Sequence, residues 1–578
     1  MSQKIHSTTP TIDVYIRLAQ YPILCDQIRM QMREELFRRG IVDATEFELE
    51  VKNLALDSQR REGVMDPFNQ EDETTWQRRI DIIRDLHTDN YFGNNLGVRL
   101  LDELIKEILS DSNQSPSQTH ELTFNPEIAP WALLFRQGKR YETIPPPKQA
   151  AVKHHLEELK VVLIKRLISD HLSFIGISKR IFSIADLHWI YDRLTGAGKI
   201  GGKAAGMMLA LKILQKEGTS VGPDISQLVD VPETDFIGSE IIYEFIYLNK
   251  MERFVNQKYL SLEEVDAQYP TVVDACLNGK LPDYIVEQLK EILKRVNGRP
   301  YTVRSSSLLE HNIKHSFADK YDSWVCINQG SEKSNLVDLL NAVRLVYAST
   351  FNPKAMQERQ EFDLIDYDER MALMVQPLVG EQYGRFFWPT IIGTGLSKNP
   401  FPLNKGEKAE DGIIRLVWGI DDRSDTPFED DNASIISLSQ PKCRISKGQK
   451  HPQQSPQTII NVVDLEKNEF NRLPIEDVLQ PDYPYLKYIA SILDGDTLKP
   501  IPHDLKHHSE DQKRGQQLVL SFDYLTRDPK FVKLMRTTLM RLETVYKTPV
   551  KIDFAIELTP AKSGVSYKLY ILQCHPQK

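Results

Sequence analysis

Apolar residues recur at helical spacing through the first third of the chain. In ILCDQIRMQMREELFRRG they return every three to five positions, and Gly40 offers a stop. Three more segments share this pattern: WQRRIDIIRDLHTDN, NNLGVRLLDELIKEIL and KQAAVKHHLEELKVVLIKRLISDHL. Polar, turn-forming residues at 110–120 and three prolines at 145–147 separate them. We therefore expect residues 1–182 to form an all-helical N-terminal accessory domain.

The pattern changes after Ser183, where glycines cluster and strand-like and helix-like segments alternate. KFVKLMRTTLMRLETVY predicts a helix near the end of the chain. VKIDFAIEL alternates apolar and polar residues and predicts a strand. In the following SYKLYILQ, a period of two predicts that Gln573 continues the apolar face of Ile571. The mixture of helices and strands predicts an α+β fold for residues 183–578.

Bulk composition excludes some classes of protein. The 578 residues correspond to about four folding units. A net charge of -9 argues against a broad nucleic-acid or anionic-membrane footprint. No apolar run approaches the length of a membrane span, and MSQKIHSTTP lacks the apolar core of a signal peptide. The five cysteines are scattered, which favours a reducing, cytoplasmic location over a disulfide framework or a zinc site.

A glycine-rich segment, LTGAGKIGGKAAGMMLALKIL, places four glycines just before Lys203 and an apolar helix. Glycines let backbone N–H groups approach an anion, and a lysine supplies a mobile positive charge for phosphate oxygens. Ala197 and Ala204 exclude a Walker A loop. A GxGxxG motif is present, but the preceding IADLHWIYDRL reads as a helix, whereas a dinucleotide fold needs a strand there. A flexible turn that caps a core helix explains the local sequence equally well.

The order of motifs is more informative than any single motif. IGGKAAGMMLAL is followed by VPETDFIGSEIIYEF, YTVRSSSLLEHNIKHSFADKYDSW, MALMVQPLVG and VKIDFAIEL...YKLYILQCHP. This series resembles the N-terminal nucleotide-binding domain of pyruvate phosphate dikinase and phosphoenolpyruvate synthase. The family patterns, in the same order, are GGKGAxLAEM, VPxGF, VRSSAxxEDxxxxSFAGQxDTF, VQxMV, and DIEWA followed by LYxLQxRP. The resemblance covers residues 183–578 and implies a bilobal ATP-grasp fold that binds ATP with Mg²⁺.

The resemblance assigns roles residue by residue. Lys203 and Arg304 match the family's phosphate-binding lysine and arginine, and are the expected catalytic residues. Asp553 replaces the glutamate of DIEWA and Gln573 matches the glutamine of LQxR, which implies magnesium ligands. The remaining nucleotide-binding positions are in the glycine loop and in the hinge where the family binds adenine: Gly201, Gly202, Gln376, Pro377 and Leu378.

This set of residues suits a triphosphate. Lys203 and Arg304 supply positive charge, Asp553 is a hard anionic ligand for Mg²⁺, and Gln573 is a neutral oxygen ligand. Taken singly, Asp553 also reads as an exposed carboxylate on the wet face of a strand. Arg304 likewise reads as a surface salt-bridge partner.

Departures from the family patterns bear on the chemistry. His575 replaces the arginine of LQxRP, Asp319 replaces a glycine, and Asp421 stands where a GLG-type loop has glycine. None of the 14 histidines lies in a GGxxSHxAI phosphohistidine loop. NQGS and VYAS also match a subgroup of PEP/pyruvate-binding proteins that lacks the phosphohistidine and phosphoenolpyruvate-barrel domains.

We therefore expect a Mg²⁺-dependent phosphotransferase domain whose acceptor is supplied by another component. That acceptor is a separate phosphohistidine-carrier protein or a small molecule, and no nucleic-acid or membrane partner is expected. The alternative is a non-catalytic nucleotide-binding module that regulates or engages a partner. A third interpretation is an enzyme of carbohydrate or antibiotic phosphorylation, because relatives of this domain phosphorylate glucans and rifamycin.

Overall fold

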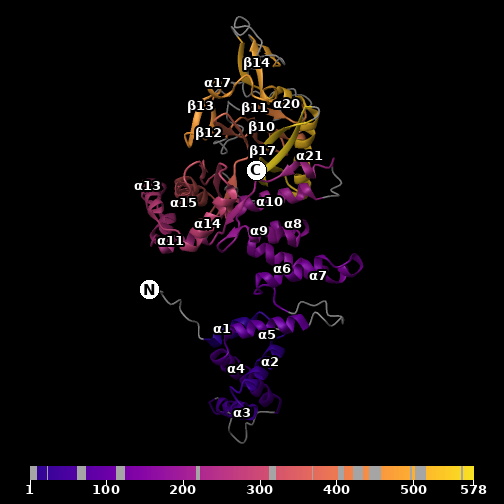
Figure 1. The fold of residues 1–578 in the computed structure, drawn as a ribbon, viewed down its shortest axis with the longest axis vertical. Helices are drawn as coiled ribbons and strands as arrows, with labels where there is room; N and C mark the ends of the chain where they lie inside the picture. Colours follow the sequence, from indigo (N-terminus) through magenta and orange to yellow (C-terminus); the bar gives the residue numbers. More distant parts are fainter. Residues whose placement is uncertain are drawn as a thin grey trace. The chain divides into compact units, whose positions relative to one another are not determined.

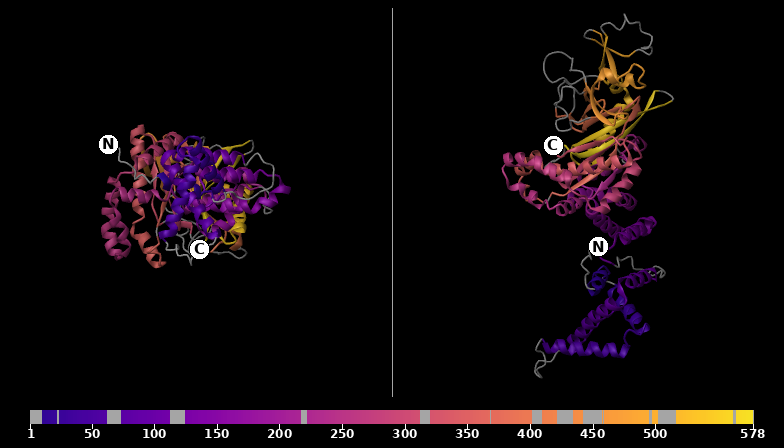
Figure 2. Two further views of the ribbon diagram at one scale, coloured as in Figure 1. Left: turned by 90° about the horizontal axis from the view of Figure 1, so that it is seen from below. Right: turned by 60° about the vertical axis from the view of Figure 1, so that its left-hand side comes forward.

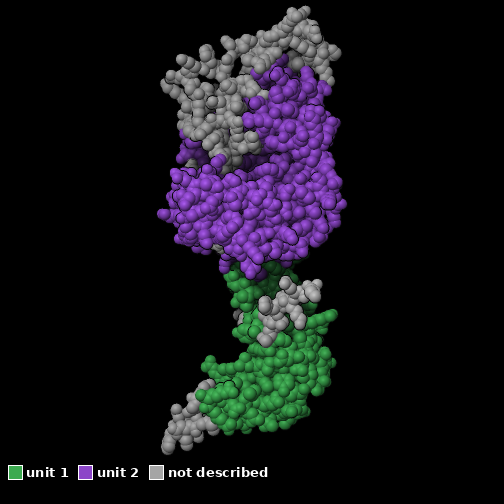
Figure 3. All heavy atoms as spheres, turned by 90° about the vertical axis from the view of Figure 1, so that its left-hand side faces the viewer, with its two compact units in different colours: residues 1–162 green, residues 163–578 purple. Residues whose placement is uncertain are grey.

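The chain divides into two compact units, residues 1–162 and residues 163–578 (Figure 3). The computed structural model describes residues 10–21, 24–61, 73–111, 124–216, 222–311, 320–367, 369–400, 409–420, 434–441, 457, 459–494, 497–501, 516–561 and 564–577. The boundary between the units falls inside helix α7 (Pro146–Leu167). The expected accessory domain ending at residue 182 remains a prediction.

The segments with helical periodicity in unit 1 are helices, as predicted. They are α2 (Cys25–Arg38), α4 (Glu73–Asn95), α5 (Gly97–Asp111) and the first part of α7. Unit 1 also contains α1 (Pro10–Ala19), α3 (Ala44–Arg61) and α6 (Trp131–Glu142), which lie outside the predicted segments (Figure 1). The apolar stripe of α2 is fully buried, and α1 and α2 both pack against α4 and α5. Arg29 of α2 pairs with Asp85 and Asp89 of α4, at 3.0 and 2.7 Å. None of the helices in the described part of the chain is long and apolar enough to cross a membrane.

The first sheet of unit 2 carries the VRSS segment. Its strand order is β1 (Leu194–Thr195), β3 (Asp235–Ile237), β6 (Met371–Pro377), β4 (Tyr301–Ser307), β5 (Ser323–Cys326). One face of this sheet packs on a helical layer: α11 (Ile241–Leu248), α13 (Leu262–Asn278), α14 (Asp283–Val296), α15 (Glu332–Ser349) and α16 (Pro353–Glu361). Figure 1 labels α11, α13, α14 and α15, and Figure 2 shows the same ribbon from two further directions. Val303, Leu373 and Val375 join that core.

A second, six-stranded sheet carries the C-terminal motifs. Its order is β11 (Ser434–Ser437), β10 (Ile413–Val417), β9 (Ile391–Leu396), β17 (Val550–Pro560), β18 (Val565–Pro576), β2 (Val229–Asp230). Helix α21 (Pro529–Tyr546) packs on β17, and α10 (Gly202–Gln215) packs on β18. The predicted C-terminal helix and two strands are thus confirmed.

Smaller elements complete unit 2. A four-stranded sheet has the order β13 (Glu469–Pro474), β12 (Ile459–Asp464), β8 (Phe386–Trp388), β7 (Glu381–Tyr383), and a three-stranded sheet has the order β15 (Thr497–Lys499), β14 (Ala490–Asp494), β16 (Gln516–Leu520). The short helices are α8 (Leu172–Ile181), α9 (Ile184–Asp192), α12 (Glu252–Val255), α17 (Ile475–Val478), α18 (Leu486–Ile489) and α20 (Asp523–Arg527), with single turns η1 (Ser226–Leu228), η2 (Asn256–Tyr259), η3 (Leu308–His311) and η4 (Ala409–Asp411). The mixture of helix and sheet agrees with the predicted α+β class.

One sequence prediction about β18 is wrong. The period of two placed Gln573 on the apolar face of Ile571, but Gln573 lies opposite Asp553 and Ile571 lies opposite Phe554. Asp553 and Phe554 are consecutive and point to opposite faces, so Gln573 and Ile571 do too. The cause is a register shift at this point, because a β-bulge inserts one extra residue and changes the phase of the strand. The bulge turns Gln573 to the face of Asp553.

Candidate functional site

The glycine segment forms a loop between β1 and α10. The expected helix, α9, precedes it, and β1 adds only two residues of strand between them. Gly201, the N-cap of α10, has φ +80°, and a Cβ on it would lie 1.5 Å from the carbonyl oxygen of Ser306. The backbone N–H of Ala204 donates to Ser306 Oγ at 3.1 Å. Only glycine at 201 therefore lets the start of α10 lie directly against β4.

The ammonium of Lys203 is buried rather than mobile. Its side chain is 3% exposed, and Nζ lies 3.0 Å from Glu310 Oε1. Nζ also donates to Ser305 Oγ at 2.9 Å. The Glu310 carboxylate accepts from the backbone N–H of Ser307 at 2.7 Å and from Ser305 Oγ at 3.2 Å. Burial raises the pKa of Glu310, while Lys203 and these hydrogen bonds act in the opposite direction.

A second buried carboxylate, Glu369, also contacts Ser307. The Ser307 hydroxyl donates to Glu369 Oε1, and Tyr321 donates to Oε2 at 3.1 Å. Arg359 is 3.9 Å from the same carboxylate. Burial raises the pKa of Glu369 also. The end of β4 is thus flanked by two acid–base pairs, Lys203–Glu310 and Arg359–Glu369.

Arg304 links the first, five-stranded sheet of unit 2 to its second, six-stranded sheet. From β4 in the first sheet, Nη1 donates to Leu572 O on β18 at 3.0 Å and to Gln376 Oε1 at 3.3 Å. Nη2 donates to Gln573 Oε1 at 3.3 Å. These bonds use three of the five N–H donors of the guanidinium and fix its plane. Among the contacts of the described residues two donors remain, and a planar guanidinium with such donors suits a phosphate.

A row of polar side chains crosses the second sheet beside this contact. Arg415, Thr394, Asp553 and Gln573 lie directly opposite one another on β10, β9, β17 and β18. Residues paired in this way share one face of the sheet. Thr394 Oγ1 donates to Asp553 Oδ1 at 2.9 Å. The row ends at Gln573, where Arg304 approaches from the first sheet.

The row contains oxygen ligands of the kind that Mg²⁺ uses. Asp553 offers a carboxylate and Gln573 an amide oxygen on neighbouring strands. Within the described ranges no group of three or more His, Cys, Asp or Glu side chains could hold a metal ion without other ligands. Protein Mg²⁺ sites commonly use one or two carboxylates and take the other ligands from substrate phosphates and water. The residues therefore fit a magnesium ion that arrives with a nucleotide.

The expected adenine hinge lies at the end of β6. Gln376 is 2% exposed, and its amide nitrogen donates to Thr234 Oγ1 at 2.9 Å while its oxygen accepts from Arg304. The backbone N–H of Leu378 donates to Pro300 O at 2.8 Å. The Gln376 side chain therefore holds the Arg304 guanidinium in this conformation. Pro377 ends β6, and Leu378 follows it.

The structure brings together four of the nine site residues that the sequence singled out. Arg304, Gln376, Gln573 and Asp553 form one cluster, whereas Lys203 begins the adjacent helix with its ammonium turned to Glu310. Gly201 and Gly202 form the turn that starts α10. Sequence reasoning missed Thr394 and Arg415, although each is a single polar residue within an apolar strand sequence, IIGTGL and IIRLV. Glu310 stands where the family pattern VRSSAxxED has its glutamate, but sequence reasoning assigned it no role.

Of the three departures from the family patterns, one, His575, lies within the described residues. Asp319 and Asp421 lie outside the described residues. His575 is 7% exposed and lies opposite Lys551 on the strand pair that carries Asp553 and Gln573. Its Nδ1 is 2.9 Å from Pro576 O.

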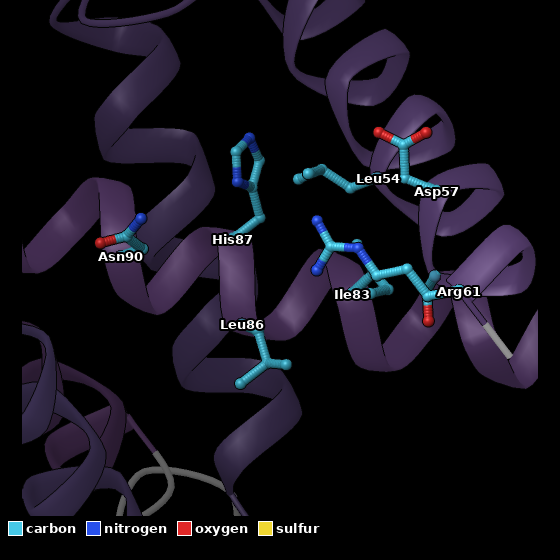
Figure 4. Close-up of a pocket in the computed structure, with 8 residues that line it drawn as sticks. Leu54, Asp57, Arg61, Ile83, Leu86, His87 and Asn90 are labelled. Carbon is cyan, nitrogen blue, oxygen red and sulfur yellow. The ribbon is translucent and has the colours of Figure 1, made fainter.

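Unit 1 contains a separate cavity of ≈ 410 Å³ between α3 and α4 (Figure 4). Apolar and polar residues line it together: Leu54, Asp57, Ser58, Arg61, Ile83, Leu86, His87 and Asn90. His87 Nε2 is 2.9 Å from Glu50 Oε2, which holds the ring in place. None of the residues predicted from the sequence as site residues lines this cavity.

Comparisons with known proteins add a family to this geometry. The family model described as the pyruvate phosphate dikinase AMP/ATP-binding domain matches residues 197–578. The match begins within the glycine loop and includes every residue of the Arg304 cluster. No curated protein matches the chain.

Proposed function

The chain belongs to the family of the AMP/ATP-binding domain of pyruvate phosphate dikinase, and from this premise we propose that residues 183–578 form a bilobal ATP-grasp domain. This domain binds ATP with Mg²⁺ and transfers a phosphoryl group. Residues 1–182 serve as a helical accessory domain. The scattered cysteines favour activity in the reducing cytoplasm.

The contact of Arg304 with both sheets carries this proposal. Its guanidinium is held by Gln376 from one side and by Leu572 O and Gln573 from the other. A fixed cation where two sheets meet, next to a carboxylate and an amide on one face, is what a Mg²⁺–triphosphate requires. Because the guanidinium is already oriented, little reorganisation is needed when phosphate binds.

Each side chain has a role in this scheme. Arg304 and Lys203 neutralise the phosphates, and the backbone at Gly201 and Gly202 presents N–H groups at the start of α10. Gln376, Pro377 and Leu378 border the adenine ring of the nucleotide. Asp553 and Gln573 would hold Mg²⁺, which would neutralise charge that develops on the transferring phosphoryl group.

The phosphoryl acceptor is a histidine on another component or a small molecule. No described side chain in the Arg304 cluster is a nucleophile suited to accept phosphate stably, since the cluster consists of Arg, Gln and Asp with the hydroxyl of Thr394 bonded to Asp553. The protein residues orient ATP and exclude water, which favours transfer over hydrolysis.

Calorimetry with the full chain tests the proposal. We expect ATP to bind in the presence of Mg²⁺ and to bind more weakly with excess EDTA. Arg304→Met should weaken binding by at least about tenfold, since a hydrogen bond to a charged group contributes about 1.5–3 kcal/mol. Arg527→Met is the matched control, because Arg527 is an exposed arginine of α20 that pairs with Asp523.

Turnover separates the enzyme from the binding module. Release of ADP, or of AMP and phosphate, above the level of Arg304→Met supports phosphotransfer. Binding without Mg²⁺-dependent release of product would support the regulatory module instead. Equal ATP affinity in Arg304→Met and Arg527→Met would refute the proposed site.

A further inference from the structure

Lys203 and Arg304 do not point to the same side of β4. Arg304 and Ser305 are consecutive residues of one strand, so their side chains leave opposite faces. Arg304 faces Gln376 and the second sheet, whereas the Lys203 ammonium lies with Ser305 and Glu310. In this conformation, the two cations therefore cannot hold one phosphate group together.

The backbone that carries Lys203 has little freedom to move. Gly201 lies against the Ser306 carbonyl with no room for a Cβ, and Ala204 N–H is bonded to Ser306 Oγ. These contacts fix the start of α10 against β4 at Ser306. A change in the position of the ammonium must therefore come from rotation of the Lys203 side chain, whose four-carbon stem allows it.

Glu310 holds the ammonium strongly on its present side. Both charged groups are buried, at 3% and 0% side-chain exposure, and lie 3.0 Å apart. Removing one member of such a pair leaves a buried charge without compensation. A phosphate that attracts Lys203 must compete with this carboxylate, because both are anions that accept hydrogen bonds from the same three N–H donors of the ammonium.

We propose that Glu310 is a positioning residue that holds Lys203 away from the nucleotide site and competes with nucleotide phosphate for its ammonium. This inference rests on the proposed nucleotide-binding function and adds an internal competitor to it. Nucleotide binding moves Lys203 from Glu310 toward Arg304. The affinity for ATP is therefore lower than the site would give with Lys203 already released.

A matched pair of variants tests this role. Glu310→Gln keeps the shape and some hydrogen bonds but removes the competing charge, so the Kd for Mg–ATP should fall by about tenfold. Glu369→Gln is the control: it neutralises the other buried carboxylate near Ser307, which pairs with Arg359 and not with Lys203. Its Kd should match that of the wild type. Thermal unfolding of each variant confirms that it is folded.

A double-mutant cycle distinguishes this role from a general structural effect. In a Lys203→Met background, Glu310→Gln should leave the Kd unchanged, because the lysine through which Glu310 acts is absent. Ser305→Ala, which removes the hydroxyl that holds Nζ beside Glu310, serves if Glu310→Gln does not fold. It should tighten binding by a smaller factor, about twofold.

Amine labelling provides a readout that does not require nucleotide binding. Acetylation of Lys203 by acetic anhydride, followed by mass spectrometry, should be slow in the wild type and several-fold faster in Glu310→Gln. Equal labelling rates would overturn the inference, as would an unchanged or higher Kd in Glu310→Gln. Failure of the wild-type protein to bind ATP, with faster labelling in the variant, would instead refute the nucleotide site and leave the Lys203–Glu310 restraint standing.

Discussion

At the scale of single residues, the position of the start of α10 depends on the absence of a Cβ atom at Gly201. Gly201→Ala would place a Cβ 1.5 Å from the Ser306 carbonyl at a positive φ, so either β4 or α10 must move. We expect a loss of several kcal/mol in unfolding free energy. Gly176→Ala in α8 is the control, since nothing lies within 4 Å of its added Cβ and helical alanine is favoured by about 0.5–1 kcal/mol. Urea unfolding measures both, and similar stabilities would contradict the close approach.

Cysteine reactivity gives a second residue-scale prediction. Burial raises the pKa of Cys276, Cys326 and Cys574 to about 12, whereas Cys25 is only partly buried. Because the thiolate is the reactive form, these three should not react with Ellman's reagent in the native protein at pH 8. Burial also raises the pKa of Cys25, so this thiol should react slowly, but it should react before the other three.

The measurement is made in a Cys443→Ser background, because Cys443 lies outside the described residues. Adding Cys25→Ser should remove the native signal, and denaturation should release the other three thiols. Rapid native reaction of three or more thiols would show that the buried cysteines open to solvent.

The site residues show what the sequence could and could not predict. The motif order identified Arg304, Gln376, Asp553 and Gln573, and these four meet. The alternation rule failed at Gln573 because a bulge has no clear signature in LYILQCHP. The Lys203–Glu310 pair also escaped prediction, since it joins residues more than a hundred positions apart and depends on how α10 lies against β4.

At the scale of elements, two reciprocal hydrogen bonds cap the first turn of α9, the helix before the glycine loop. Ser183 Oγ accepts from Asp186 N–H at 3.1 Å, and Asp186 Oδ2 accepts from Ser183 N–H at 2.8 Å. Asp186 also pairs with Lys212 of α10 at 2.7 Å. The capping box fixes the first turn of α9, and the ion pair holds α9 and α10 together around the loop. Sequence periodicity predicted both helices, but not the pairing between them.

This pairing predicts a pH-dependent stability. Burial opposes ionisation of Asp186, but the hydrogen bonds from Lys212 and Ser183 outweigh it and lower its pKa. A carboxyl group with a lowered pKa in the folded state adds stability above its unfolded pKa, and this stability is lost as the pH falls through the folded value. Asp186→Asn should therefore be less stable than the wild type at pH 7.

The difference between wild type and Asp186→Asn should narrow as the pH falls below about 4, where unfolded aspartate becomes protonated. Urea unfolding at pH 7 and near pH 3 measures this difference. Asp192→Asn in the same helix is the control, because Asp192 is exposed and pairs only with His188 among the contacts described. A difference that stays constant with pH would show that Asp186 acts through its shape and not its charge.

At the scale of the whole molecule, every residue of the candidate site belongs to unit 2, which begins at Leu163. The family match begins later, at residue 197. The residues between support the glycine loop: Ile200 N–H donates to Leu167 O at 2.9 Å, and Lys199 pairs with Asp170 at 2.7 Å. Helix α8 also packs on α10. The change of sequence pattern after Ser183 indicated where the motifs start. It did not predict the contacts of the glycine loop with the preceding helices.

Two fragments test where the functional domain begins. A fragment of residues 146–578, which keeps α7 whole, should bind Mg–ATP with the affinity of the full chain, because it retains the site and its supports. A fragment of residues 183–578 loses the Leu167 and Asp170 contacts, so it should unfold at a lower temperature and bind ATP more weakly. Calorimetry and thermal unfolding compare them. Equal affinity and stability in both fragments would show that α8 and the end of α7 are dispensable for the nucleotide site, whereas loss of binding in the longer fragment would show that the site depends on unit 1.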